Sequence, residues 1–201
     1  MSGHIEHRDD IGSRLGMWIF IFTELLLFGG LFLVYAVYRL MHPEQFHEAA
    51  MELNAFIGTI NTVVLLISSM TIAMAITAIQ KGNKKLSMLL ILITLLLAAA
   101  FMVNKYFEWG HKFHLDLFPG SETMLQLDHG HILFFGLYFF MTGLHALHIV
   151  IGAVLLTVCF FRVKSGHVNA DQNMLLVNSG LYWHLVDLIW IFLFPLLYLI
   201  S

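Results

Sequence analysis

Five long apolar runs dominate the sequence, and their lengths constrain the fold more than any other feature. They cover approximately residues 15–40, 56–79, 86–107, 132–161 and 179–200. A bilayer core about 30 Å thick needs roughly 20 apolar residues per helix. Each run is long enough, and a lipid-exposed backbone must satisfy its hydrogen bonds within its own segment. The sequence therefore predicts an all-α integral membrane bundle of five transmembrane helices.

The composition also favours a membrane protein. Hydrophobic residues make up 59% of the 201 residues and charged residues 11%, whereas soluble domains average about 25% charged residues. The net charge of -3 gives no support for a nucleic-acid partner. We expect a polar cytoplasmic leader at residues 1–14 and one membrane domain at residues 15–201. The leader contains acids and the first run is too long for a signal peptide, so we expect the leader to be retained.

The basic residues between the runs predict the orientation, because cytoplasmic segments carry an excess of lysine and arginine. With a cytoplasmic N-terminus, the inner side would hold seven basic residues: Arg8, Arg14, Lys81, Lys84, Lys85, Arg162 and Lys164. The outer side would hold three: Arg39, Lys105 and Lys112. We therefore expect the N-terminus to be cytoplasmic and, after five spans, the C-terminus to be outside.

Glu24 is an acid inside the first apolar run, in the stretch MWIFIFTELLLFGG. It follows Arg14 by ten residues, which corresponds to roughly 15 Å of helix and places it near the midplane. A charge at that depth costs at least ~2.5–3.5 kcal/mol on insertion scales. Glu24 must therefore face protein or water, or stay protonated. Both a structural hydrogen-bond partner and a functional acid fit this pattern.

The fourth and fifth runs add four polar side chains at membrane depth. His145 and His148 are three residues apart in MTGLHALHIVIG, and the spacing of His184 and Asp187 in GLYWHLVDLIWIF is the same. Residues at this spacing share a helix face. Counting from the predicted helix ends brings Asp187 near the depth of Glu24. We therefore hypothesise a buried Glu, Asp and His cluster with a proton-related role; interhelical hydrogen bonding alone, or a local His184–Asp187 pair, is the alternative.

The remaining polar residues have simpler interpretations. Lys105 and Glu108, near the outer end of the third run, are expected to form an interfacial ion pair with a snorkelling lysine stem. Cys159 is the single cysteine, which excludes an internal disulfide and a cysteine-rich metal cluster within this chain, and we interpret it as a packing residue. Gly143 and Gly152 suit close helix packing. We predict no metal ligands and interpret the loop histidines as solvated.

Five strings of the sequence together resemble subunit III of the haem-copper terminal oxidases. They are FTELLLFGGLFLVYAVYR, NTVVLLISSMTIAMAITA, KYFEWGHKF, FFGLYFFMTGLHALHIVIGAVLLTVCFFR and GLYWHLVDLIWIFLFPLLYLIS. The resemblance runs from about Arg14 to the C-terminus, and the combination of TGLHALHIVIG with YWHLVDLIW is specific. The family's intramembrane acids and histidines fall on these residues: Glu24, His145, His148, His184 and Asp187.

The resemblance implies a non-catalytic accessory subunit of a respiratory oxidase that couples oxygen reduction to proton translocation. In that family subunit III carries no haem or copper, which reside in partner subunits. It packs on subunit I, holds phospholipid in a cleft, and supports proton uptake and stability during turnover. The resemblance includes cytochrome c oxidases and quinol oxidases, and it implies a multi-pass protein of a bacterial or archaeal cytoplasmic membrane. Longer members have two further N-terminal helices that form one wall of the cleft, so here another subunit would have to supply that wall.

Three alternatives to an oxidase subunit fit some of these features: a membrane cytochrome, a proton-coupled transporter and an accessory protein of a nitric oxide reductase. A b-type haem could be ligated by His145 or His148 together with His184, which would make the chain a membrane cytochrome. Glu24 and Asp187 could serve a proton-coupled transporter, although five helices give no even inverted repeat and no span is broken by proline. An accessory protein of a nitric oxide reductase would share the subunit III resemblance.

Overall fold

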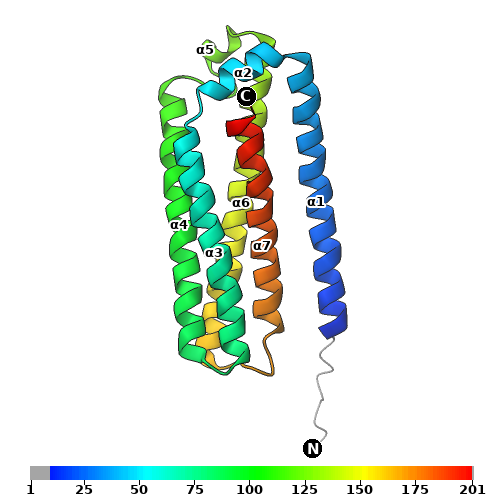
Figure 1. Cartoon of the computed structure of the whole chain (residues 1–201), viewed down its shortest axis with the longest axis vertical. Coiled ribbons are helices and arrows are strands. Elements are labelled where there is room, and N and C mark those ends of the chain that lie inside the picture. The colour runs from blue at the N-terminus through cyan, green and yellow to red at the C-terminus, as the bar shows by residue number, and fades with distance from the viewer. Residues whose placement is uncertain (1–9, 201) are drawn as a thin grey trace, which may run out of the picture.

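The computed structural model describes residues 10–200 and shows long helices that run along a common axis (Figure 1). Five of them are long and apolar enough to span a membrane. They are α1 (Asp10–Met41), α3 (Ala55–Gln80), α4 (Lys84–His114), α6 (His129–Ser165) and α7 (Met174–Phe194), which continues into the π-helix η1 (Pro195–Leu199). Two short helices, α2 (Pro43–Met51) and α5 (Glu122–Leu125), lie in the connections. The described residues contain no strand, and the predicted all-α bundle of five spans is confirmed.

The helices are longer than the apolar runs. With 31 and 37 residues, α4 and α6 extend over about 46 and 55 Å, so their polar ends project beyond a bilayer core. α1 ends at Met41 and Pro43 starts α2, where its missing N–H breaks no helical hydrogen bond. Of the predicted leader, residues 1–9 lie outside the described residues, and residues 10–14 form the start of α1.

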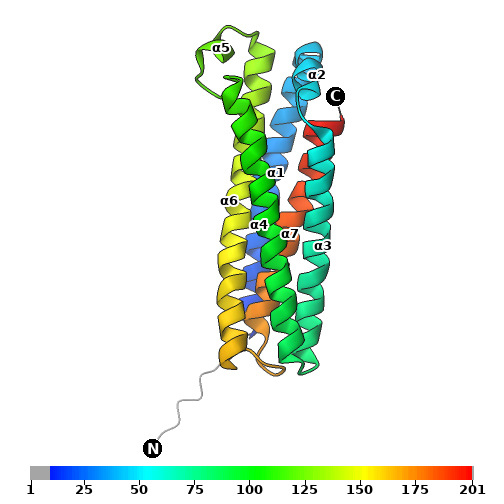
Figure 2. The ribbon, with the colours of Figure 1, turned by 90° about the vertical axis from the view of Figure 1, so that its left-hand side faces the viewer.

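Four helices form a closed core. α3 packs against α4 and α7, and α6 packs against the same two helices (Figure 2). Trp183 and Trp190 of α7 are fully buried in its centre. A Cβ at Gly152 of α6 would lie 2.8 Å from the Trp183 ring, so this glycine allows the close packing predicted from the sequence. Gly143 does not have this role, because a Cβ there would be 3.9 Å from its nearest neighbour, Trp109.

α1 lies to one side of this core, where it contacts α6 and α7 (Figure 1). Only 11% of its most apolar segment is buried, compared with 33–61% in the other four spans. Three of its buried residues, Ile21, Phe28 and Tyr35, recur every seven positions and form one stripe. α1 is therefore attached to the core along a narrow line, and most of its surface is left for lipid or for another subunit.

Most basic residues of the described chain lie toward one end of the bundle: Arg14, Lys81, Lys84, Lys85, Arg162 and Lys164. This end carries the start of α1, the turn at residues 81–83 and the connection from α6 to α7, while α2, α5 and η1 lie at the other end (Figure 1). Nζ of Lys84 donates a hydrogen bond to the Lys164 carbonyl oxygen at 2.8 Å, which joins two of these segments. The structure therefore has the basic end on which the predicted orientation is based. That this end, with the start of α1, is cytoplasmic stays a prediction.

Candidate functional site

Glu24 and His148 join α1 to α6 at membrane depth. Oε2 of Glu24 lies 3.0 Å from Nε2 of His148, and the two side chains are 15% and 9% exposed. Asn178 of α7 also donates a hydrogen bond to Ser13 near the start of α1, at 2.8 Å. Glu24 thus faces protein, as its depth required, and its partner is one of the two histidines singled out on the fourth span.

The backbone of α6 determines which nitrogen of His148 carries a proton. Nδ1 lies 2.7 Å from the carbonyl oxygen of Leu144, and because a carbonyl only accepts, Nδ1 must be the donor. The arrangements of lowest charge then place one proton between Nε2 and Glu24. That proton is either donated by Nε2 to a carboxylate or donated by the acid to neutral Nε2. Both arrangements leave the pair with no net charge, which avoids an isolated buried charge at this depth.

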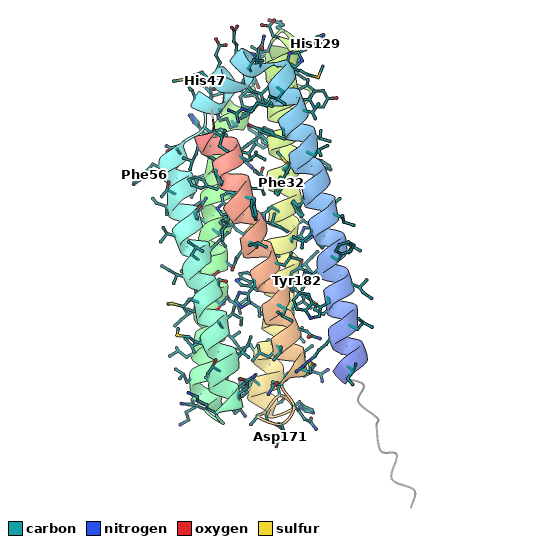
Figure 3. The ribbon with its side chains drawn as sticks, turned by 45° about the vertical axis from the view of Figure 1, so that its right-hand side comes forward. Phe32, His47, Phe56, His129, Asp171 and Tyr182 are labelled. Carbon is teal, nitrogen blue, oxygen red and sulfur yellow. The ribbon has the colours of Figure 1, made fainter. Side chains whose placement is uncertain are left out.

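Aromatic rings enclose the pair. The Phe28 ring meets the His148 ring edge-on, with centroids 5.4 Å apart, and the Tyr182 ring stacks on it at 6.4 Å. The Tyr182 hydroxyl donates to the His148 carbonyl oxygen at 3.2 Å. Figure 3 shows Tyr182 and Phe32 in the space between α7 and α1. These rings limit access to the pair and fix the orientation of its imidazole.

An apolar groove lies between α1 and α7 beside this pair. Its volume is about 190 Å³, and its walls are Leu25, Phe28, Gly29, Phe32, Leu188, Ile189 and Phe192. Phe28 is shared with the polar pair, so the groove begins next to the imidazole of His148. A Cβ at Gly29 would meet nothing within 4 Å, which leaves this wall open. A groove of this lining suits a hydrocarbon chain.

His145 does not join the pair, although it lies one turn before His148. Its ring is completely buried between Phe101, at 5.6 Å, and Trp190, at 5.1 Å between centroids. Neither ring nitrogen has a hydrogen-bond partner among the described residues. Positions three apart still differ by about 60° around a helix, and that difference turns His145 into the four-helix core while His148 points toward α1.

His184 and Asp187 lie apart from the Glu24–His148 pair, so only Glu24 and His148 of the hypothesised cluster are in direct contact. Nδ1 of His184 lies 2.6 Å from Oγ of Ser69 on α3. Asp187 is 3% exposed, and no direct hydrogen bond joins it to His184 among the described residues. Ser69, the partner of His184, also interacts with Asp187, so the two side chains are related through Ser69 and not as a direct pair. Gly180, two turns before Asp187, packs against Ile76 of α3. Asp187 therefore lies on the α3 side of α7, away from Glu24.

Lys105 and Glu108 form the predicted ion pair, but the predicted snorkelling of the lysine to water is wrong, because the pair is enclosed by protein. Nζ of Lys105 lies 3.1 Å from Oε1 of Glu108, and the two side chains are only 2% and 5% exposed. Nζ also donates to the Tyr198 hydroxyl at 2.8 Å, and the hydroxyls of Tyr138 and Tyr198 donate to Glu108. The rings of Tyr138, Trp190 and Tyr198 surround the ammonium at 5.1–5.4 Å. Since these groups satisfy the ammonium inside the core, the lysine has no need to extend to water.

The sequence analysis missed the tyrosines and the serine of these clusters. Tyr138 in FFGLYFF and Tyr198 in FPLLYLI bring hydroxyls deep into apolar runs, and a buried tyrosine hydroxyl usually has a partner. That signal identifies them as candidates. Ser69 gives no comparable signal, because serine in a membrane helix commonly bonds its own backbone. Among residues 10–200, no group of three or more His, Cys, Asp or Glu is placed to hold a metal ion.

Comparisons with known proteins agree on one family. The family described as cytochrome c oxidase subunit III matches residues 1–201. Cytochrome c oxidase subunit 3 of Thermostichus vulcanus is 35% identical over 188 residues, which cover 93% of this chain and 87% of the relative. Probable quinol oxidase subunit 3 of Staphylococcus saprophyticus is 30% identical over 204 residues, with coverage of 98% and 94%. Heme-copper oxidase subunit I+III of Aeropyrum pernix is 30% identical over 210 residues, which cover 100% of this chain and 24% of that longer relative.

Proposed function

This chain belongs to the cytochrome c oxidase subunit III family, and on that basis we propose that it holds lipid and a proton-sharing acid beside subunit I. It is an accessory subunit of a haem-copper oxidase and associates with subunit I. Its oxidase reduces oxygen and translocates protons, and it lies in a bacterial or archaeal cytoplasmic membrane with the N-terminus of this chain inside. The basic end of the bundle and the bacterial relative from Staphylococcus saprophyticus support this placement.

The groove between α1 and α7 is the proposed lipid site. Its lining is apolar throughout, and its volume of about 190 Å³ admits part of an acyl chain rather than a whole phospholipid. α1 leaves most of its own surface uncovered, so the remainder of the lipid, or the helix of another subunit, covers the groove from outside. The single observation that carries this proposal is the open apolar wall at Gly29.

The Glu24–His148 pair fastens α1 to the core and supports proton uptake by the neighbouring subunit. The hydrogen bond of Nδ1 to Leu144 leaves one movable proton between the acid and Nε2. A neutral pair at this depth changes the local field when that proton moves from one group to the other. The pair acts on subunit I through this field and through the position of α1.

A b-type haem cytochrome is not favoured. The imidazole of His148 already bonds Leu144 and Glu24, and His184 bonds Ser69. His145 is packed between the rings of Phe101 and Trp190. The relatives are named as cytochrome c oxidase, quinol oxidase and haem-copper oxidase subunits, so an accessory protein of a nitric oxide reductase is not favoured either.

Filling the groove tests the lipid proposal. Gly29→Leu places a side chain in the groove, whereas Gly30→Leu adds the same side chain to an exposed neighbour that does not line it. We expect the purified complex with Gly29→Leu to retain less phospholipid by mass spectrometry and to lose activity sooner during turnover. The Gly30→Leu complex should match wild type in both. Equal lipid content in all three complexes would rule out a lipid in this groove.

A further inference from the structure

A cavity lies between α3 and α4 at the end of the bundle that carries α2 and η1 (Figure 1). Its volume is about 590 Å³. Its walls include Leu53 of the α2–α3 connection, Ile57 of α3, and Phe107, Glu108 and Lys112 of α4. We call this cavity the α3–α4 inlet. It shares no wall residue with the apolar groove between α1 and α7.

Glu108 brings the buried ion pair into the wall of the inlet. Three donors converge on its Oε1: the ammonium of Lys105 and the hydroxyls of Tyr138 and Tyr198. Its Oε2 accepts only from Lys105 among the described residues, at 3.2 Å. A carboxylate oxygen can accept more than one hydrogen bond, so Oε2 keeps capacity for a donor that enters through the inlet.

The position of Glu108 along α4 favours water as that donor. Glu108 directly follows the apolar run at residues 86–107 and lies 23 residues beyond Lys85, which corresponds to roughly 35 Å of helix. That distance exceeds the thickness of a bilayer core, about 30 Å. Two further wall residues, Glu52 and His111, are exposed. The inlet therefore opens at the boundary of the membrane, where water is present.

Lys112 holds the inlet together from inside. Its Nζ donates to the carbonyl oxygen of Glu52 at 2.7 Å and to Oε2 of the same residue at 3.4 Å. Among residues 10–200, these are the only hydrogen bonds that join the α2–α3 connection at residues 52–54 to α4. Lys112 is 3% exposed, so its ammonium depends on this contact. Loss of the contact would free the connection to move away from α4.

We propose that the α3–α4 inlet admits water from the adjoining aqueous phase to Glu108, and that the Lys112–Glu52 contact limits how far the inlet opens. Water that donates to Oε2 exchanges protons between Glu108 and the aqueous phase. It also competes with the tyrosine hydroxyls for the carboxylate. Because Tyr198 belongs to η1, the Lys112–Glu52 contact then controls how firmly η1 is held against α4.

Cysteine labelling in the complete oxidase tests for water in the inlet. Ile57→Cys places a thiol in the wall, whereas Ile60→Cys places one on the outside of α3, at a position that does not line the inlet. Charged methanethiosulfonates form a mixed disulfide with a hydrated thiolate and release sulfinate. We expect rapid labelling of Ile57→Cys and little labelling of Ile60→Cys or of the buried native Cys159. An unreactive Ile57→Cys in a folded chain would mean that the inlet holds no water, and would overturn the proposal.

Lys112→Met in the Ile57→Cys background tests the contact that limits opening. We expect a cationic and an anionic methanethiosulfonate both to react roughly tenfold faster, because a hydrogen bond from a charged group shifts a local opening equilibrium by about that factor. Glu52→Gln is the matched control and should keep the original rate, since the main-chain carbonyl oxygen still accepts from Lys112.

Three results would contradict the role of this contact. Unchanged rates in Lys112→Met would show that the contact does not limit opening. Opposite changes for the two reagents would show an effect of charge alone. Labelling of Cys159 in the same variant would show that the whole bundle had loosened.

A water-soluble carbodiimide tests whether the inlet reaches Glu108. The reagent adds to a carboxyl group to give an O-acylisourea, and an added amine then displaces the urea and leaves an amide that mass spectrometry detects. Ile57→Trp fills the inlet and should lower the labelling of Glu108 relative to exposed Glu48, whereas Ile60→Trp should not. Equal labelling of Glu108 in the two variants, or none in the unaltered chain, would show that water does not reach Glu108 by this route.

Discussion

Glu24 on α1 and His148 on α6 are 124 residues apart in the chain, and their side chains meet at 3.0 Å. Each side chain supplies the hydrogen-bond partner of the other, and either one alone would be costly at membrane depth. It also adds a directional bond to a helix that otherwise packs along a narrow stripe of Ile21, Phe28 and Tyr35. The Glu24–His148 contact and the hydrogen bond from Asn178 to Ser13 thus supplement the apolar stripe in positioning α1.

Removal of the Glu24 carboxyl should loosen α1. In Glu24→Ala, Nε2 of His148 has no partner, and we expect the loss of about 0.6–2 kcal/mol of interhelical interaction. Glu24→Gln should remain close to wild type, because its amide can donate to Nε2. The measurement is the temperature at which this chain unfolds in the solubilised oxidase. Equal unfolding temperatures for Glu24→Ala and Glu24→Gln would mean that the hydrogen bond adds no stability.

Removal of one member of the buried Lys105–Glu108 ion pair should strongly destabilise the folded chain. Lys105→Met leaves Glu108 charged in the core without its cation, which costs about 3–5 kcal/mol for buried pairs. Adding Glu108→Gln should restore most of that loss, since an amide oxygen still accepts from Tyr138 and Tyr198. Denaturant titration of the single and double variants measures the coupling. A double variant as unstable as Lys105→Met would show that charge is not the cause.

Gly152 should tolerate no side chain. In Gly152→Ala, the new Cβ would lie 2.8 Å from the Trp183 ring, and we expect a cost of about 1–3 kcal/mol from overpacking. Gly16→Ala on α1 is the control, because a Cβ there meets nothing within 4 Å and alanine is the better helix former. Thermal unfolding of both variants gives the comparison. An unchanged Gly152→Ala would mean that α6 and α7 are free to move apart.

Cys159 should be unreactive in the folded chain. It is the single cysteine and is completely buried, and its thiol lies 3.3 Å from Oγ of Ser179. A maleimide reagent should label it only after denaturation, and mass spectrometry can count the label. Rapid labelling of the native complex would show that the α6–α7 contact opens at this level.

The sequence predicted the membrane spans much better than the directions of side chains around each helix. The apolar runs identified all five spans, because length and composition alone decide whether a helix can cross a bilayer. Residue counting also brought Asp187 near the depth of Glu24. Residue counting gave no information on which neighbouring helix Asp187 faces. The structure places Asp187 on the α3 side of α7.

The error at Lys105 has a different origin. Its sequence position near the end of an apolar run favoured a snorkelling side chain, which is the usual solution for an isolated lysine. The structure supplies partners from two other helical segments, Tyr138 of α6 and Tyr198 of η1. Tyr198 belongs to a π-helix that begins at Pro195. Contacts that depend on such a local change of helix geometry are not visible in hydropathy or spacing.

The most direct test of the account removes this chain from its oxidase and measures haem content and active lifetime in the same preparation. The account predicts an unchanged ratio of haem to subunit I, because the chain is an accessory subunit, and a shorter active lifetime during turnover. Loss of haem together with this chain, or a lifetime equal to that of the complete oxidase, would contradict it.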